Sequence, residues 1–169
     1  EVHEVIEAYE PWTDYAKAVA DIGILILEDH ELGDNHSGAV RMLGELNYTY
    51  DIIHEHHDLN RYKVIIMPDD ISVTPVLQQK LEDFIKQGGG VISSGRSGLN
   101  PEGTAFALDE WNVQYDGEDP WNSSYFKMLK DTKGNVPDML CGIYNQGIFL
   151  QLKEGSESIA DYFQPYFNR

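Results

Sequence analysis

Cysteine is almost absent from this chain of 169 residues, and its absence excludes two ways of stabilising a fold. The single Cys141 cannot form a disulfide within the chain, and it cannot build a zinc site from cysteine ligands. Stability must therefore come from a hydrophobic core. A chain of this size, with 41% hydrophobic residues, can build one, because a single domain of similar length buries about 70% of its unfolded surface.

Positive charge is also scarce, with 12 Lys and Arg against 29 Asp and Glu and a formal net charge of −17. Nucleic acids and anionic membranes are bound through basic surfaces, so this balance excludes both as partners. No apolar run approaches the about 20 residues that a membrane-spanning helix needs. The acidic composition suits a cation or a neutral polar ligand such as a sugar.

Histidine is missing after His57, and this absence bears on catalysis. Hydrolases and glutamine amidotransferases of the α/β type place a serine or cysteine nucleophile on a tight turn between spaced glycines, with a histidine as base. The corresponding turn here is "VISSGRSG" (91–98), in which Ser93 and Ser94 lack that glycine spacing. We interpret these serines as structural and expect no catalytic residue in this chain.

Four short apolar segments predict strands, and two amphipathic segments between them predict helices. The strands are "DIGILILED" (21–29), "YDIIHE" (50–55), "YKVIIMPD" (62–69) and "GGVISSG" (89–95), and the helices cover 36–47 and 74–89. Continuously apolar strands are typical of parallel sheets with helices on both faces. The order β-α-β-β-α-β therefore predicts an α/β fold, a three-layer sandwich with a mostly parallel, flavodoxin-like sheet.

The helix over 74–89 carries the clearest signals. Thr74 suits the N-cap, Pro75 suits the first helical position, and Gly88 can adopt the left-handed conformation that ends a helix. We expect its apolar stripe to pack against the strands at 22–27 and 64–67; the stripe consists of Leu77, Leu81, Phe84 and Ile85.

Beyond Gly95 the pattern is weaker. Residues 106–115 predict a short helix that runs into a fifth strand, and 116–139 predict a long irregular excursion. In residues 141–155 apolar and polar side chains alternate on both sides of Asn145-Gln146-Gly147, which predicts a hairpin. Residues 156–163 predict a last helix.

Ligands of parallel α/β sheets bind at the carboxyl ends of the strands. The polar residues at these ends are therefore the candidate ligand-binding residues: Glu28, Asp29, His30, Asp69, Asp70, Ser94 and Arg96. We expect the ends of the strands at 21–29 and 62–69 to lie side by side.

The segment "HEHHD" (54–58) holds half of the six histidines and resembles a metal site at first sight. On a strand, His54 and His56 share one face while Glu55 and His57 point the other way, so these residues cannot converge on one ion. His54 and His56 remain weak metal candidates. We interpret the segment as a solvated strand exit and expect neither a metal nor a cofactor.

The run "YKVIIMPDDISVTPVLQQKLEDFIKQGGGVISSGRSGL" (62–99) resembles the β-galactosidase trimerisation domain, the middle domain of bacterial β-galactosidase-like enzymes of glycoside hydrolase family 42. "EPWTDYAKAVADIGILI" (10–26) resembles the linker that enters this domain, and "SESIADYFQPYFNR" (156–169) resembles a late segment after which relatives continue. The resemblance implies a class I glutamine-amidotransferase-like fold without its catalytic triad, and a glycosidase carboxylate pair on an upstream barrel.

The resemblance also implies a division of the chain and a set of partners. Residues 1–20 would be a linker from an upstream catalytic domain, 21–163 the trimerisation-type domain, and 164–169 the start of a continuing segment. The partners would be other domains of the same glycosidase, sister subunits in a homotrimer and a carbohydrate substrate, in a soluble protein of the bacterial cytoplasm or periplasm.

Two further hypotheses remain open beside this non-catalytic assembly or substrate-cleft domain. The first is a module that binds a sugar or a cation through the strand-end residues. The second, the least favoured, is an independent hydrolase that uses Ser93 or Ser94.

Overall fold

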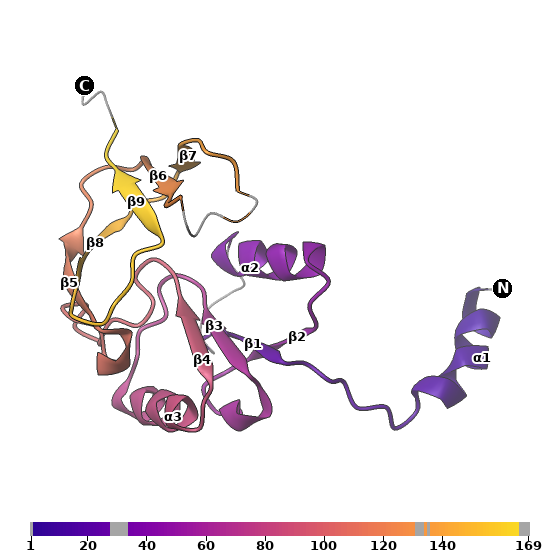
Figure 1. Ribbon diagram of the computed structural model, residues 1–169. Coiled ribbons are helices and arrows are strands. Elements are labelled where there is room, and N and C mark those ends of the chain that lie inside the picture. Colours follow the sequence, from indigo (N-terminus) through magenta and orange to yellow (C-terminus); the bar gives the residue numbers. More distant parts are fainter. Residues whose placement is uncertain (1, 28–33, 131–133, 135, 166–169) are drawn as a thin grey trace.

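The computed structural model describes residues 2–27, 34–130, 134 and 136–165, and its centre is a parallel sheet (Figure 1). The four strands are β1 (Ile22–Leu25), β2 (Tyr50–Ile53), β3 (Val64–Met67) and β4 (Gly90–Ser93). They lie in the order β2-β1-β3-β4, and each neighbouring pair is parallel. The predicted parallel α/β fold is confirmed, including the adjacency of β1 and β3.

Helices cover both faces of this sheet and complete three layers. On one face, α3 (Pro75–Lys86) and the short helix η1 (Leu59–Arg61) close the main core with Leu25, Ile65 and Met67 from the strands. On the other face, α2 (Asp34–Glu45) packs Ala39 and Leu43 against Ile24. Side chains alternate between the two faces along each strand, so both faces of the sheet must be apolar.

Helix α3 is built as its sequence predicts. The Thr74 hydroxyl accepts a hydrogen bond from the Leu77 amide at 3.2 Å, and Gly88 ends the helix with φ +94°. The predicted stripe faces the core, with Leu77, Leu81 and Phe84 buried and Ile85 packed against them. Gly89 is required next, because a Cβ atom there would overlap the Phe84 ring.

Helix α1 (Val2–Thr13) lies apart from the sheet, at the end of an extended segment (Figure 1). Its apolar side chains recur every three or four residues and form a stripe on one side of the helix. All of them are exposed: Val2, Val5, Ile6, Tyr9 and Trp12. We call these five residues the α1 stripe.

None of the helices within the described part of the chain has the length and the hydrophobicity needed to cross a bilayer.

The C-terminal half forms two small antiparallel sheets. Strand β5 (Val113–Glu118) pairs with β8 (Ile148–Leu152), and β6 (Ser124–Met128) lies between β7 (Cys141–Ile143) and β9 (Ala160–Phe163). The predicted short helix and fifth strand are present as η2 (Asp109–Trp111) and β5. The strand does not extend the parallel sheet, however.

Three predictions for this half are wrong. Residues 160–163 form a strand instead of a helix, because β6 offers backbone partners that outweigh the local apolar spacing. The segment 116–139 contains a strand of its own. Strands β7 and β8 join different sheets instead of forming a hairpin, since the turn between them is bound elsewhere: the Asp119 amide donates to the Gly147 carbonyl at 2.9 Å.

Asp119 is the polar centre of this half. Asp119 is fully buried. Its carboxylate accepts hydrogen bonds from the Trp121 amide at 3.0 Å and from the Tyr162 hydroxyl. Its carbonyl accepts from Gln146 Nε2 at 2.8 Å. A buried carboxylate is tolerated only when it is hydrogen-bonded, so Asp119 ties the end of β5, the β7–β8 turn and β9 together.

We expect Phe84→Ala to lower the free energy of unfolding by about 3–5 kcal/mol, because it leaves a cavity beneath α3. Urea denaturation of the chain measures this difference. Val76→Ala is the matched control, since Val76 lies on the same helix with 63% of its surface exposed and should change stability by less than about 0.5 kcal/mol. Equal losses in the two variants would contradict the packing of α3.

We expect Tyr162→Phe to cost about 1–3 kcal/mol at neutral pH, because one oxygen of the buried Asp119 carboxylate loses its partner. Burial of the hydroxyl and its bond to Asp119 raise the pKa of Tyr162 above its usual value of 10.0. The stability that comes from the neutral phenol is thus complete below about pH 10 and is lost as the pH rises through the folded-state pKa.

Urea denaturation at pH 7 and above pH 10 measures both the cost of Tyr162→Phe at neutral pH and its dependence on pH. The difference between wild type and Tyr162→Phe should shrink at the higher pH, and Tyr125→Phe serves as the control on β6. A difference that grows above pH 10 would show that the phenol is not stabilised in its neutral form.

Candidate functional site

The residues that follow β3 and β4 lie at one edge of the sheet, because the two strands are parallel and adjacent. The Ser94 hydroxyl donates to Asp69 Oδ1 at 2.6 Å, and the Asp69 amide donates to Ser94 Oγ at 3.2 Å. Gly95 has φ +55°, and a Cβ atom there would lie 2.6 Å from Asp69 Oδ1. A glycine at 95 therefore allows the two strand ends to approach each other.

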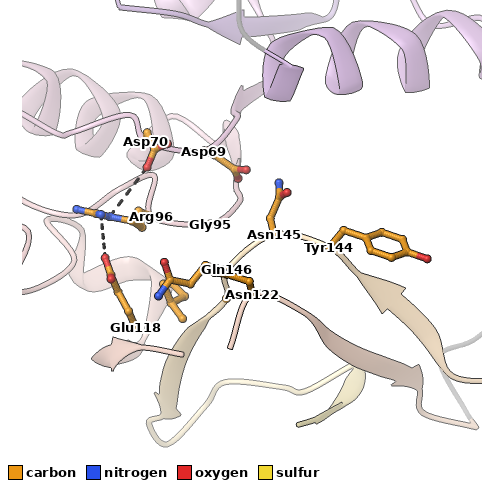
Figure 2. A pocket seen from close by; sticks show the side chains of 11 residues that line it. Asp69, Asp70, Gly95, Arg96, Glu118, Asn122, Tyr144, Asn145 and Gln146 are labelled. Carbon is orange, nitrogen blue, oxygen red and sulfur yellow. Dashed lines mark ion pairs between the residues drawn. The ribbon is translucent and has the colours of Figure 1, made fainter. Parts of the chain in front are cut away.

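Arg96 connects this edge to the C-terminal half. Its Nη1 lies 2.8 Å from Glu118 Oε1 at the end of β5, and its Nε lies 4.0 Å from Asp70 Oδ1 (Figure 2). Both pairs are exposed to solvent, so each adds at most about 1 kcal/mol to stability. Their main effect is to set the position of the guanidinium between two carboxylates.

Asp70 has φ +64°, an uncommon conformation for a residue other than glycine. Such conformations cluster at ligand sites and switch regions. The carboxylate of Asp70 is thereby placed beside Arg96 at the mouth of the space between the two halves (Figure 2).

A cavity of 420 Å³ lies between the strand ends and the C-terminal half. Figure 2 shows Asp69, Asp70 and Arg96 along one wall, and the segments around Glu118, Asn122 and the β7–β8 turn along the other. The lining consists of Asp69, Asp70, Gly95, Arg96, Glu118, Asn122, Tyr144, Asn145, Gln146, Gly147 and Ile148. We call this space the strand-end cavity.

The structure brings together four of the seven candidate residues. Asp69, Asp70 and Arg96 line the strand-end cavity, and Ser94 fixes Asp69 from behind. Glu28, Asp29 and His30 lie outside the described residues. Apart from Gly95, which follows β4, the other lining residues come from the C-terminal half and were not predicted. The polar excursion after Tyr115 and the Asn145-Gln146-Gly147 turn were the signals that could have pointed to them.

The weak metal candidates His54 and His56 lie away from this cavity, beyond the last residue of β2. The chain turns there, with the His57 amide donating to the His54 carbonyl at 3.0 Å. Thr74 and Lys80 hold Glu55 from α3: the Thr74 hydroxyl donates to its carboxylate at 3.2 Å, and the Lys80 ammonium donates to its carbonyl. In the part of the chain that the structure describes, no three His, Cys, Asp or Glu side chains are grouped to hold a metal ion.

Both serines of the "VISSGRSG" turn are engaged in local structure. The Ser93 hydroxyl donates to the Ser97 carbonyl, and the Ser94 hydroxyl donates to Asp69. Asp69 forms two hydrogen bonds with the Ser94 hydroxyl, one through its carboxylate and one through its amide, and these bonds position the strand ends.

Comparisons with known proteins agree with this architecture. The family model of the β-galactosidase trimerisation domain matches residues 40–135. Beta-galactosidase Pbg of Clostridium perfringens is 25% identical over an alignment of 140 residues that covers 73% of this chain and 19% of that protein.

Solved structures extend the similarity to nearly the whole chain. The α-L-fucosidase isoenzyme 2 from Paenibacillus thiaminolyticus superimposes with a TM-score of 0.87 and 35% identity, over 99% of this chain and 26% of that chain. The β-galactosidase from Bacillus circulans sp. alkalophilus superimposes with a TM-score of 0.74 and 19% identity, over 96% of this chain and 27% of that chain. The chain thus spans about a quarter or less of the length of these relatives. Because the family model covers more than half of it, the chain belongs to the β-galactosidase trimerisation domain family, a non-catalytic domain of glycoside hydrolases, as the sequence resemblance predicted.

Proposed function

We propose that this chain is the assembly and substrate-cleft domain of a larger bacterial glycosidase and does not cleave glycosidic bonds itself. The match of the trimerisation domain model to residues 40–135 carries the proposal. The β-galactosidase and the α-L-fucosidase named above are about four times as long as this chain. The chemistry would then belong to another part of the enzyme.

The α1 stripe supports a division of the chain into a linker and a domain. Residues 1–20 would lead from a catalytic domain, 21–163 would form the trimerisation-type domain, and 164–169 would begin a continuing segment. Five exposed apolar side chains on one side of a helix mark a contact surface, and none of the other residues that the structure describes covers them. We place that surface on the catalytic domain, with which α1 would pack.

The oligomer proposed for the whole enzyme is a homotrimer, in which this domain contacts sister subunits and lies beside a carbohydrate substrate. The family description supports the trimer. The sugar is a second question. The sequence of this chain is 35% identical to the α-L-fucosidase and 25% identical to the Clostridium perfringens β-galactosidase. An α-L-fucosidase is therefore the second candidate, beside a β-galactosidase, for the enzyme that contains this domain.

We expect the isolated chain to hydrolyse neither a chromogenic β-D-galactoside nor a chromogenic α-L-fucoside. Its serine hydroxyls at the strand ends are bonded to neighbouring groups, and the strand-end carboxylates bind Ser94 and Arg96. The assay is release of nitrophenol, with the full-length enzyme as positive control, and the preferred glycoside of that enzyme identifies the sugar. Hydrolysis by the isolated chain that disappears in Asp70→Asn, Glu118→Gln or Ser94→Ala would overturn the proposal.

We expect Ile6→Asp to leave the melting temperature of the isolated chain unchanged, because Ile6 is exposed there. In the full-length enzyme the same change should lower the melting temperature by several degrees, since a charge would be buried between α1 and the catalytic domain. Differential scanning fluorimetry of both proteins makes the comparison, and Glu7→Asp is the control on the same helix. Equal behaviour of the two Ile6→Asp proteins would show that α1 does not pack on the catalytic domain.

A further inference from the structure

Hydrogen bonds and ion pairs within the chain hold the walls of the strand-end cavity. Asp69 is bonded twice to Ser94, and Gln146 is held by the carbonyl of the buried Asp119. Arg96 bridges Asp70 on one wall to Glu118 on the other. Its volume of 420 Å³ falls within the range of small-molecule sites, about 300–1,000 Å³. A cavity that is already organised loses little entropy when it binds a ligand.

The charge of the lining restricts the ligand. Three carboxylates face one guanidinium, and that guanidinium is already paired with two of them. The chain as a whole carries a formal net charge of −17. Phosphate, sulfate and carboxylate ligands would be repelled, so the cavity suits a neutral or cationic molecule.

The hydrogen-bonding groups of the lining favour the neutral class. Asn122 and Asn145 line the cavity and bond to no other residue in the described part of the chain. Each carboxamide can both donate and accept, whereas Asp69 and Asp70 accept only. A mixture of this kind matches hydroxyl groups, each of which donates one hydrogen bond and accepts others.

An aromatic ring lies at the rim of the same cavity. Tyr144 is 89% exposed, and Figure 2 shows it beyond Asn145, on the opposite side from Arg96. An exposed tyrosine offers a ligand a rigid apolar ring together with a polar hydroxyl group. The C–H face of a pyranose ring is apolar and stacks on aromatic rings, while its hydroxyl groups point to polar neighbours.

We propose that the strand-end cavity is a carbohydrate-binding site, in which Tyr144 stacks on the sugar ring while Asp69, Asp70, Asn122 and Asn145 bind its hydroxyl groups. This site goes beyond the assembly role, because every lining residue belongs to this chain and the site needs no second subunit. A basic side chain from another domain is the competing occupant. The amide N–H groups of Asn122 and Asn145 can donate to hydroxyl oxygens, whereas a guanidinium or an ammonium offers them no acceptor, so we favour the sugar.

Titration of the 15N-labelled chain, followed by NMR, tests the proposal. The probes are methyl β-D-galactopyranoside and methyl α-L-fucopyranoside, with inorganic phosphate as the anionic probe and arginine amide as the basic one. At least one glycoside should saturate with a millimolar dissociation constant and shift the amides of residues 69–70, 95–96 and 144–147. Phosphate should shift none of them.

Two variants locate the site. Tyr144→Ala should weaken glycoside binding about tenfold, the loss of one aromatic contact, and Asn145→Ala should weaken it less. Tyr48→Ala is the matched control, because Tyr48 is an exposed tyrosine that does not line the cavity. The proposal is overturned if a folded chain shows no saturating shift with either glycoside, if both variants bind like wild type, or if only arginine amide shifts these residues. None of these results depends on whether the enzyme forms trimers.

Discussion

The parallel pairing of β1, β3 and β4 is the constraint on which the rest of the structure depends. Parallel strands need crossover connections, and the crossovers place α2 and α3 on the two faces of the sheet. Strand β3 is central to this arrangement, since Ile65 and Met67 are fully buried and pack against α3. The same geometry sends the carboxyl ends of the strands to one edge, which is why Asp69 and Ser94 meet across 25 positions of sequence.

The sequence predicts the parallel half well because its signals there are local and agree with one another. Thr74, Pro75 and Gly88 mark the ends of α3, and the apolar spacing within it matches the buried residues. The antiparallel half is less predictable because its strands are short and their state is decided by distant partners. Residues 160–163 are a strand only because β6 lies beside them.

The two walls of the candidate site differ in the same way in how well the sequence predicts them. Residues after β3 and β4 could be predicted, since any parallel sheet exposes its strand ends at one edge. The opposite wall could not, because the alternation around the Asn145-Gln146-Gly147 turn predicts a hairpin, whereas the two flanking strands pair with β6 and β5. Asp119 is an example. An aspartate in a polar segment predicts an exposed side chain, yet Asp119 is fully buried and its hydrogen bonds hold together the C-terminal half of the fold.

The separation of α1 from the sheet affects how chaperones and proteases treat the protein before α1 is covered. An apolar helix that stays uncovered after its own domain has folded is a binding signal for chaperones and a target for proteases. In an enzyme molecule whose catalytic domain has not folded, the α1 stripe would stay uncovered, and the molecule would be removed even though the core of this domain is intact. The α1 stripe would in this way make the survival of this domain depend on the folding of the domain that covers it.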